Sequence, residues 1–337
     1  MLLLSVVVAL GVAVYRVMKW AEAPVVSDQD HPASKVVTIP DRSTFFQVAT
    51  LLEQEGLIKS RSAFVLLGRS QSADRRIRAG EYELNSAMAP ADILAKLLSG
   101  QVVLHPITVP EGLAMVQIAA LMEQHEVADR TDFLKLARDG SFIASLGLKV
   151  DSLEGYLFPD TYKFPKAVRT KDILATMVEH FRQAYRPELQ ARADDMRMTQ
   201  HEVVTLASVI EKETGADAER AEISAVFHNR LRKHIPLQSD PTVIYGLTGF
   251  DGNIRKKDLS SPSPYNTYRV VGLPPGPIAS PGLRAIEAAL YPSNSRALYF
   301  VSRNDGTHHF SSTLSEHNQA VEKYQKRPFR RGALPRT

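Results

Sequence analysis

Two glutamates near the middle of the sequence are its strongest candidates for chemistry. Glu211 and Glu213 occupy the last turn of a helix that should begin after Thr199. At about 100° per residue they fall on opposite sides of the helix's apolar stripe, so only one can face a given cleft. The helix dipole disfavours negative charge at this end and raises the pKa of both carboxyls, which would suit a general acid. The alternative is a pair of solvated acids at a helix end.

Three segments could form a sugar-binding cleft around such an acid. Residues 153–162 (LEGYLFPDTY) place acids near rings that can stack on pyranose faces, and residues 238–245 (QSDPTVIY) and 265–268 (YNTY) supply short polar groups. A loop with four prolines follows at 272–282, and rigid polar loops often carry binding residues. Each segment could equally be a well-packed turn. The predicted substrate-binding residues are Glu154, Tyr156, Asp160, Gln238, Ser239, Asp240, Tyr265, Asn266 and Tyr268.

Metal and cofactor chemistry find little support in the sequence. Asp305, His308 and His309 could be metal ligands, but neighbouring strand residues point to opposite faces, so we predict no metal site. The chain has no Gly-rich phosphate loop, nucleophile elbow or HExxH motif. Its lack of cysteine excludes thiol nucleophiles and Cys-ligated zinc. We therefore expect an activity without a cofactor.

The charge balance argues against nucleic acid as the main partner. The 41 basic and 37 acidic residues give a net charge of +4, but residues 323–337 hold six of the basic residues and no acid. The rest of the chain is therefore slightly acidic. A nucleic-acid-binding domain would need a concentrated basic surface on a folded module.

Several elements that would position the two glutamates can be predicted from local patterns. Thr199 and Glu202 form a capping box, and the following apolar residues recur at helical spacing, which predicts an amphipathic helix. Gly215 should end this helix as a C′ residue. Residues 304–306 (NDG) predict a hairpin turn between strands at 298–302 and 308–311, followed by the last helix.

The whole chain is predicted to be α+β, with an N-terminal membrane helix at 1–20 and a tether at 21–35. The first 15 residues are almost wholly apolar, which supports a membrane helix. A cleaved signal peptide is the alternative. The basic residues follow the apolar run, whereas an anchor with its N-terminus in the cytoplasm should have them before it. Residues 36–104 predict a strand–helix–helix–strand unit that resembles a LysM-like α/β subdomain. A purely structural unit is equally compatible with that pattern. Residues 105–325 form a larger mixed α+β domain, and 326–337 a basic disordered tail.

Six long motifs, in one order, resemble the MltG/YceG family of endolytic murein transglycosylases. They are ASVIEKETG (207–215), VFHNRL (226–231), LQSDPTVIYGL (237–247), SPYNTYRVVGLPPGPIASPG (263–282), LYFVS (298–302) and HHFSSTLSEHN (308–318). LEGYLFPDTY adds to the match. The resemblance is strong over residues 150–325 and looser over 36–150.

This resemblance implies a single-pass protein of the inner membrane. Its catalytic domain would lie in the periplasm and act on peptidoglycan glycan strands. The reaction cleaves the β-1,4 bond between N-acetylmuramic acid and N-acetylglucosamine and leaves a 1,6-anhydro end without consuming water. Glu213 matches the family's catalytic glutamate, and Glu211 is a possible second acid. Peptidoglycan synthases are expected partners, with trimming or termination of nascent strands as the role. The alternatives are a non-catalytic peptidoglycan-binding scaffold and a hydrolase in which Asp240 or Glu154 activates water.

Overall fold

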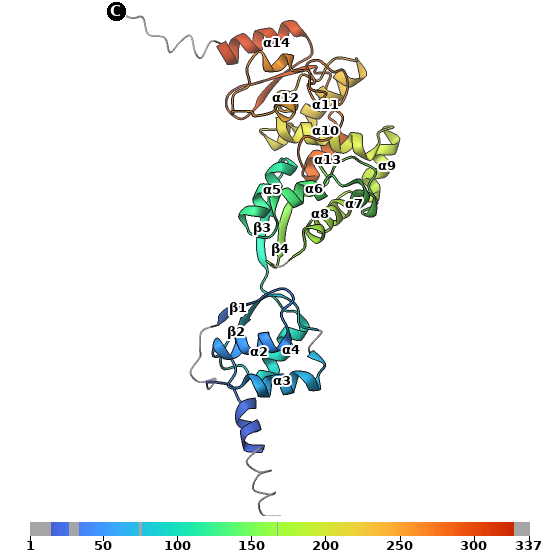
Figure 1. Ribbon diagram of the computed structural model, residues 1–337. Helices are drawn as coiled ribbons and strands as arrows, with labels where there is room; N and C mark the ends of the chain where they lie inside the picture. Colours follow the sequence, from blue (N-terminus) through green and yellow to red (C-terminus); the bar gives the residue numbers. More distant parts are fainter. Residues whose placement is uncertain (1–14, 27–33, 74–75, 167, 327–337) are drawn as a thin grey trace, which may run out of the picture. The chain divides into compact units, whose positions relative to one another are not determined.

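The protein is a mixed α+β chain whose described residues fall into two compact units (Figure 1). The computed structural model describes residues 15–26, 34–73, 76–166 and 168–326. The first unit contains residues up to Pro106 together with Lys163–Val168, and the second contains Ile107–Tyr162 and the chain from Arg169 onward. The division passes through β3 (His105–Val109) and β4 (Asp160–Phe164), which pair in a two-stranded sheet.

The first unit has the predicted strand–helix–helix–strand order and then one more helix. β1 (Lys35–Ile39) pairs antiparallel with β2 (Gly80–Leu84), so that Lys35 lies opposite Leu84. Between and after the strands lie α2 (Phe45–Gln54), α3 (Arg61–Ser70) and α4 (Pro90–Ser99). The helices bury one apolar face each against the sheet and each other, around the fully buried Tyr82 and Leu94.

The predicted membrane anchor lies mostly outside the described residues. Residues 1–14 are not described, and residues 15–22 form a helix that continues past the predicted end of the anchor at residue 20. Within the described chain, no helix has the length and apolar character needed to cross a bilayer. The predicted disordered tail also lies outside the described residues from 327 onward.

The second unit begins with four helices around the β3–β4 pair and continues with the helices that carry the candidate site. The first group comprises α5 (Met115–Gln124), α6 (Arg130–Leu136), α7 (Gly140–Ser145) and α8 (Thr170–Ala184). The later helices and turns are α9 (Pro187–Asp195), α10 (Gln200–Glu213), η3 (Asp217–Glu219), α11 (Arg220–Arg232), α12 (Asp240–Gly246), η4 (Asp258–Ser260) and α13 (Leu283–Leu290).

A hairpin and a last helix end the described chain. β5 (Tyr299–Ser302) pairs antiparallel with β6 (His308–Ser311), and this confirms the hairpin predicted around residues 304–306. The predicted last helix, α14 (Leu314–Val321), begins with a capping box of Thr313 and Glu316 and continues into a π-helical turn, η5 (Glu322–Lys326).

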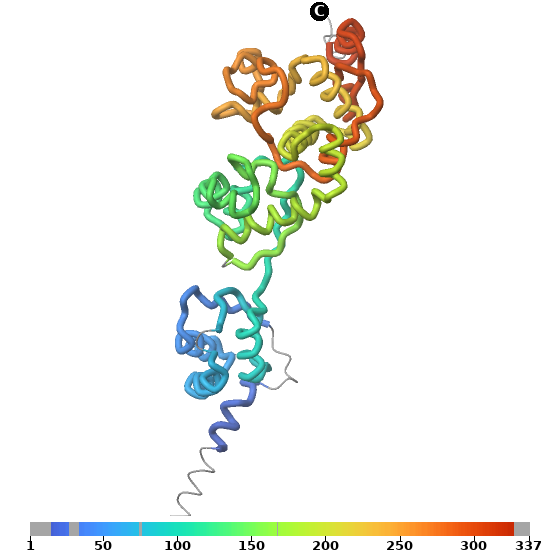
Figure 2. The backbone as a smooth tube through the Cα atoms, turned by 90° about the vertical axis from the view of Figure 1, so that its right-hand side faces the viewer, coloured from blue at the N-terminus to red at the C-terminus, as the bar shows by residue number. Residues whose placement is uncertain are grey.

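α10 is the central helix of the second unit and packs along α13 (Figure 2). Its capping box is present as predicted, because the Glu202 N–H donates to Thr199 Oγ1 at 3.2 Å and the Thr199 N–H donates to Glu202 Oε2 at 2.7 Å. The predicted one-sided burial is wrong: all residues from Val203 to Ile210 are buried. Other segments cover every face of this helix, so its position is tightly fixed.

The predicted end of α10 is confirmed, with Gly215 directly after the C-cap residue Thr214, but the predicted conformation of Gly215 is wrong. This glycine does not have the left-handed backbone of a C′ residue, and α10 ends with the extended residue Thr214. The hairpin loop explains the glycine, because a Cβ at residue 215 would lie 3.0 Å from the Gly306 carbonyl oxygen. Gly215 therefore lets the β5–β6 loop approach the end of α10 closely.

Candidate active site

Glu213, the last residue of α10, lines a pocket of about 400 Å³ within the second unit. The pocket walls come from segments far apart in the sequence, which the fold brings to the C-terminal end of α10. The lining residues are Glu213, Phe227, Arg230, Leu237, Gln238, Asp240, Tyr268, Tyr299, Phe300, Leu314, His317 and Asn318. Three predicted substrate-binding residues, Gln238, Asp240 and Tyr268, thus surround the predicted catalytic acid.

Ser239 is the direct partner of Glu213. Its hydroxyl donates to Glu213 Oε1 at 2.6 Å. Two buried threonines hold Ser239 in place: its N–H donates to Thr267 Oγ1 at 3.1 Å, and its carbonyl accepts from Thr242 Oγ1 at 2.7 Å. The two threonine hydroxyls also bond each other at 2.8 Å. One side of the Glu213 carboxyl is therefore oriented by a rigid buried network.

The chain enters this network through a strained residue. Gln238 has a left-handed backbone with φ of 54°, which is uncommon for a residue other than glycine. Arg230 stabilises this turn, because its Nη1 donates to the carbonyls of Pro236 and Leu237 and to Gln238 Oε1 at 2.9–3.1 Å. Its Nε donates to the Leu298 carbonyl at 2.7 Å, which ties the turn to the hairpin.

The surroundings keep Glu213 in its protonated form to higher pH than an ordinary glutamate. Burial is the main cause of its raised pKa, and the hydrogen bond from Ser239 opposes the shift. The negative charge of Asp240 adds to the rise. Asp240 is itself held by the Tyr268 hydroxyl, which donates to Asp240 Oδ1 at 2.7 Å. Glu213 thus meets the requirements of a general acid at the edge of an open pocket.

Glu211, the possible second acid, has a different environment. It accepts a hydrogen bond from the Gly282 N–H at 3.0 Å, and its Oε1 lies 3.6 Å from Arg220 Nη2. Both side chains of this ion pair are less than 10% exposed. Burial raises the pKa of Glu211, although the Gly282 N–H opposes the shift. Glu211 therefore joins α10 to a loop and to α11.

The proline-rich loop at 272–282 is attached along the whole length of α10. The Pro275 carbonyl bonds His201 Nε2 at 3.0 Å near the start of the helix, and the Ile278 N–H donates to Ser208 Oγ at 3.0 Å in its middle. The Glu211 contact is the third of these attachments. This loop is one wall of the scaffold that fixes α10.

Comparisons with known proteins agree with this architecture. The model of the YceG-like family matches residues 37–323. The chain belongs to the YceG-like family. A Bacillus subtilis (strain 168) protein named endolytic murein transglycosylase is 35% identical over 316 residues, which is 88% of this chain and 86% of that protein.

Two further members extend the comparison. A Streptococcus pneumoniae serotype 2 protein of the same name is 30% identical, covering 88% of this chain but 59% of that longer protein. A crystal structure of a YceG-like protein from Listeria monocytogenes superposes with a TM-score of 0.60 at 35% identity, covering 85% of this chain and 98% of the other. The fold is therefore that of the YceG-like family.

The other residues predicted to bind substrate do not line the Glu213 pocket. Glu154 is buried, and its oxygens accept from the Met115 N–H at 2.8 Å and from Tyr245 Oη at 3.0 Å. Burial raises its pKa to about 7. Tyr265 packs on the Tyr245 ring, with centroids 4.8 Å apart. Asp160 begins β4 and bonds His180 at 2.9 Å.

Tyr156 and Asn266, both predicted to bind substrate, are buried, and their polar atoms bond groups of the protein. Tyr156 is 1% exposed, with its hydroxyl 3.0 Å from His201 Nδ1. Asn266 is fully buried, and its Nδ2 donates to the carbonyls of Leu259 and Ser261. Their polar atoms hold loops in place, which composition alone could not distinguish from sugar binding.

Sequence reasoning missed several residues of the site. Arg230 and Thr267 orient the Ser239 turn, and His317 and Asn318 of α14 line the Glu213 pocket. The His317 ring stacks on Tyr299 at 5.1 Å, and its buried Nδ1 has no partner among the described residues. The one signal in the sequence that could have identified these residues is their place within the motifs that resemble the family, since each of them lies in such a motif.

The two adjacent histidines of β6 have separate partners. His308 Nδ1 bonds Glu219 at 2.8 Å, and the His309 ring packs near Tyr324. Within the described residues, no group of three His, Asp or Glu side chains is arranged to hold a metal ion.

Proposed function

We propose that this chain is an endolytic murein transglycosylase whose general acid is Glu213. The observation that carries the proposal is the position of Glu213, which combines a raised pKa, an orienting serine and an open pocket. Membership of a family whose curated members bear this name supports the substrate class. The substrate is the glycan strand of murein, and no cofactor takes part.

In the first step, protonated Glu213 donates its proton to the glycosidic oxygen as the bond between muramic acid C1 and that oxygen breaks. Charge then develops on the sugar ring as an oxocarbenium-like state. The Asp240 carboxylate, on the same pocket wall, can stabilise this positive charge. Gln238, Tyr268, His317 and Asn318 are the side chains that would contact the sugars there.

In the second step, the muramic acid C6 hydroxyl attacks C1 and closes the 1,6-anhydro ring. Glu213, now a carboxylate, accepts the hydroxyl proton and returns to its starting state. Because the substrate supplies its own nucleophile, the enzyme needs neither a second carboxylate to activate water nor a covalent adduct. One correctly placed acid is sufficient.

The same proposal includes attachment to the inner membrane through residues 1–20, with the catalytic unit in the periplasm. The apolar sequence of residues 1–15 supports this attachment. The first unit would act as a LysM-like glycan-binding subdomain. Peptidoglycan synthases at the membrane are the proposed partners, and nascent strands would be trimmed or terminated beside them.

The mass of the products tests the reaction. The purified full chain is incubated with uncrosslinked glycan strands, and the fragments are analysed by mass spectrometry. We expect internal cleavage and anhydro ends on the muramic acid. Fragments heavier by one water would instead identify a hydrolase, with Asp240 as the residue to activate that water. Intact strands would leave a binding scaffold as the remaining interpretation.

A further inference from the structure

A second and larger cavity of the catalytic unit lies on another face of α11 from the Glu213 pocket. It has a volume of about 890 Å³ and is bordered by the start of α10, the end of α9, α11 and the proline-rich loop. On α11, Phe227 and Arg230 line the Glu213 pocket, whereas His228, Leu231 and Arg232 line this one. The proposed reaction uses none of these three.

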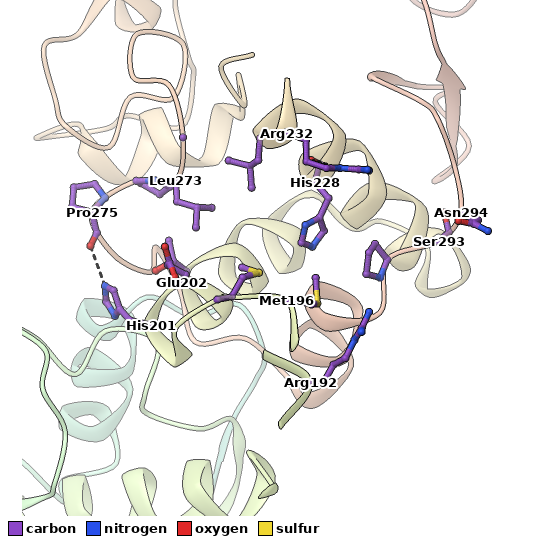
Figure 3. A pocket seen from close by; sticks show the side chains of 16 residues that line it. Arg192, Met196, His201, Glu202, His228, Arg232, Leu273, Pro275, Ser293 and Asn294 are labelled. Atoms are coloured by element: carbon purple, nitrogen blue, oxygen red, sulfur yellow. Dashed lines mark hydrogen bonds between the residues drawn. The ribbon is translucent and has the colours of Figure 1, made fainter. Parts of the chain in front are cut away.

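The walls of the cavity are both apolar and rigid. Met196, Met198, Leu231 and Leu273 supply apolar surface, and the side chains of Met196, His228 and Glu202 point into the space (Figure 3). His201 fixes the rim, because one ring nitrogen bonds Tyr156 Oη and the other bonds the Pro275 carbonyl, each at 3.0 Å. The cavity is thus held open by the same scaffold that fixes α10.

The cavity adjoins a smaller pocket of about 450 Å³, with which it shares Arg232 and Asn294, and the two pockets together have a basic lining. Four cations line the two pockets, Arg192, Arg232, Lys233 and Arg296, and in the described chain none of them forms an ion pair with a carboxylate. The one acid among the described lining residues is Glu202, whose Oε2 is occupied by the helix cap. The combined lining of the two pockets therefore has a net charge of +3, of which the large cavity alone contributes +1.

We propose that this basic pocket, defined by Arg192, Arg232, Lys233, Arg296 and the apolar wall, binds the peptide stem that murein carries on its muramic acid. This inference rests on the proposed function. A murein stem combines small apolar side chains with free carboxylates, which matches apolar walls beside cations that have no carboxylate partner among the described residues. An anionic phosphate polymer would use the cations but leave the apolar wall without a partner.

The spacing of the two pockets fits this ligand. Glu202 and Glu213 are 11 residues apart on α10, which corresponds to about 16 Å along the helix axis. A stem of four or five residues spans about 13–18 Å when extended. A peptide attached to a sugar in the Glu213 pocket is therefore long enough to reach the large cavity where Glu202 lines it, which would select stem-bearing glycan.

Direct binding of the free stem tests the inference without requiring glycan cleavage. The full chain is titrated by calorimetry with the tetrapeptide that an amidase releases from murein. We expect saturable binding that is at least about tenfold weaker in Arg192→Gln/Arg232→Gln. The double variant Lys233→Glu/Arg296→Glu should also weaken binding of the tetrapeptide. Because the side chains of Lys233 and Arg296 are exposed, this variant should keep the fold. Lys256→Gln/Lys257→Gln removes two exposed charges elsewhere and should bind normally.

The outcomes separate this inference from the proposed function. Glu213→Gln should bind the tetrapeptide as the wild type does, so that loss of cleavage and loss of stem binding are independent. The inference is overturned if the tetrapeptide does not bind, or binds equally to both pocket variants. It is also overturned if inorganic polyphosphate occupies the pocket and the tetrapeptide cannot displace it.

Discussion

Among the described residues of the second unit, Glu154, Glu211 and Glu213 have raised pKa values, and Glu213 lines an open pocket. Glu213 accepts a hydrogen bond from Ser239, and its largely buried side chain lines a pocket of about 400 Å³. Glu211 and Glu154 accept hydrogen bonds from backbone N–H groups of Gly282 and Met115, and their second oxygens face Arg220 and Tyr245. A perturbed carboxyl is therefore a candidate acid only where its proton can reach a substrate.

Breaking the buried ion pair between Glu211 and Arg220 gives the largest expected effect on stability. Arg220→Met leaves the Glu211 carboxylate buried without its cation, and we expect the free energy of unfolding to fall by about 3–5 kcal/mol. Urea denaturation measures the change. Arg182→Met is the matched control, since Arg182 pairs with Glu179 at the surface of α8 and its loss should cost less than about 1 kcal/mol. Equal effects would remove the distinction between the buried pair and a surface pair.

The buried carboxyl of Glu154 should make the stability of the fold depend on pH. Its pKa is raised from 4.5 to about 7, so the folded state holds the proton more tightly than the unfolded state does. Its contribution to stability is therefore complete below pH 4.5 and declines as the pH rises to about 7. Glu154→Gln should remove a decline of about 3 kcal/mol. Unfolding curves between pH 4.5 and 8 measure it, with the exposed Glu123→Gln as control.

Ser239→Ala tests the hydrogen bond that orients the Glu213 carboxyl. Losing a hydrogen bond to a charged group costs about 1.5 kcal/mol, so kcat should fall about tenfold. Because Ser239 lowers the pKa of Glu213, its removal should also move the alkaline decline in kcat to higher pH. The pH profile of kcat measures both effects. The exposed Ser145→Ala should change neither, and an unshifted profile in Ser239→Ala would contradict the assigned role.

Local patterns predicted the elements around the site better than the contacts within it. The capping box at Thr199, the hairpin around residue 305 and the opposite directions of Glu211 and Glu213 follow from helix and turn geometry, and each is present. Contacts such as those of Thr267 with Ser239 join residues far apart in the sequence, and no local pattern encodes them. The burial of Tyr156 and Asn266 likewise depends on tertiary packing.

The most direct test of the account compares turnover of glycan strands by Glu213→Gln and Glu211→Gln. Glu213→Gln removes the proton donor, so we expect a loss of about 10²–10⁴-fold in kcat with the unfolding free energy nearly unchanged. Glu211→Gln removes a scaffold contact, so kcat should stay within about tenfold of the wild type. Near-normal turnover in Glu213→Gln, or a larger loss in Glu211→Gln than in Glu213→Gln, would contradict the central claim.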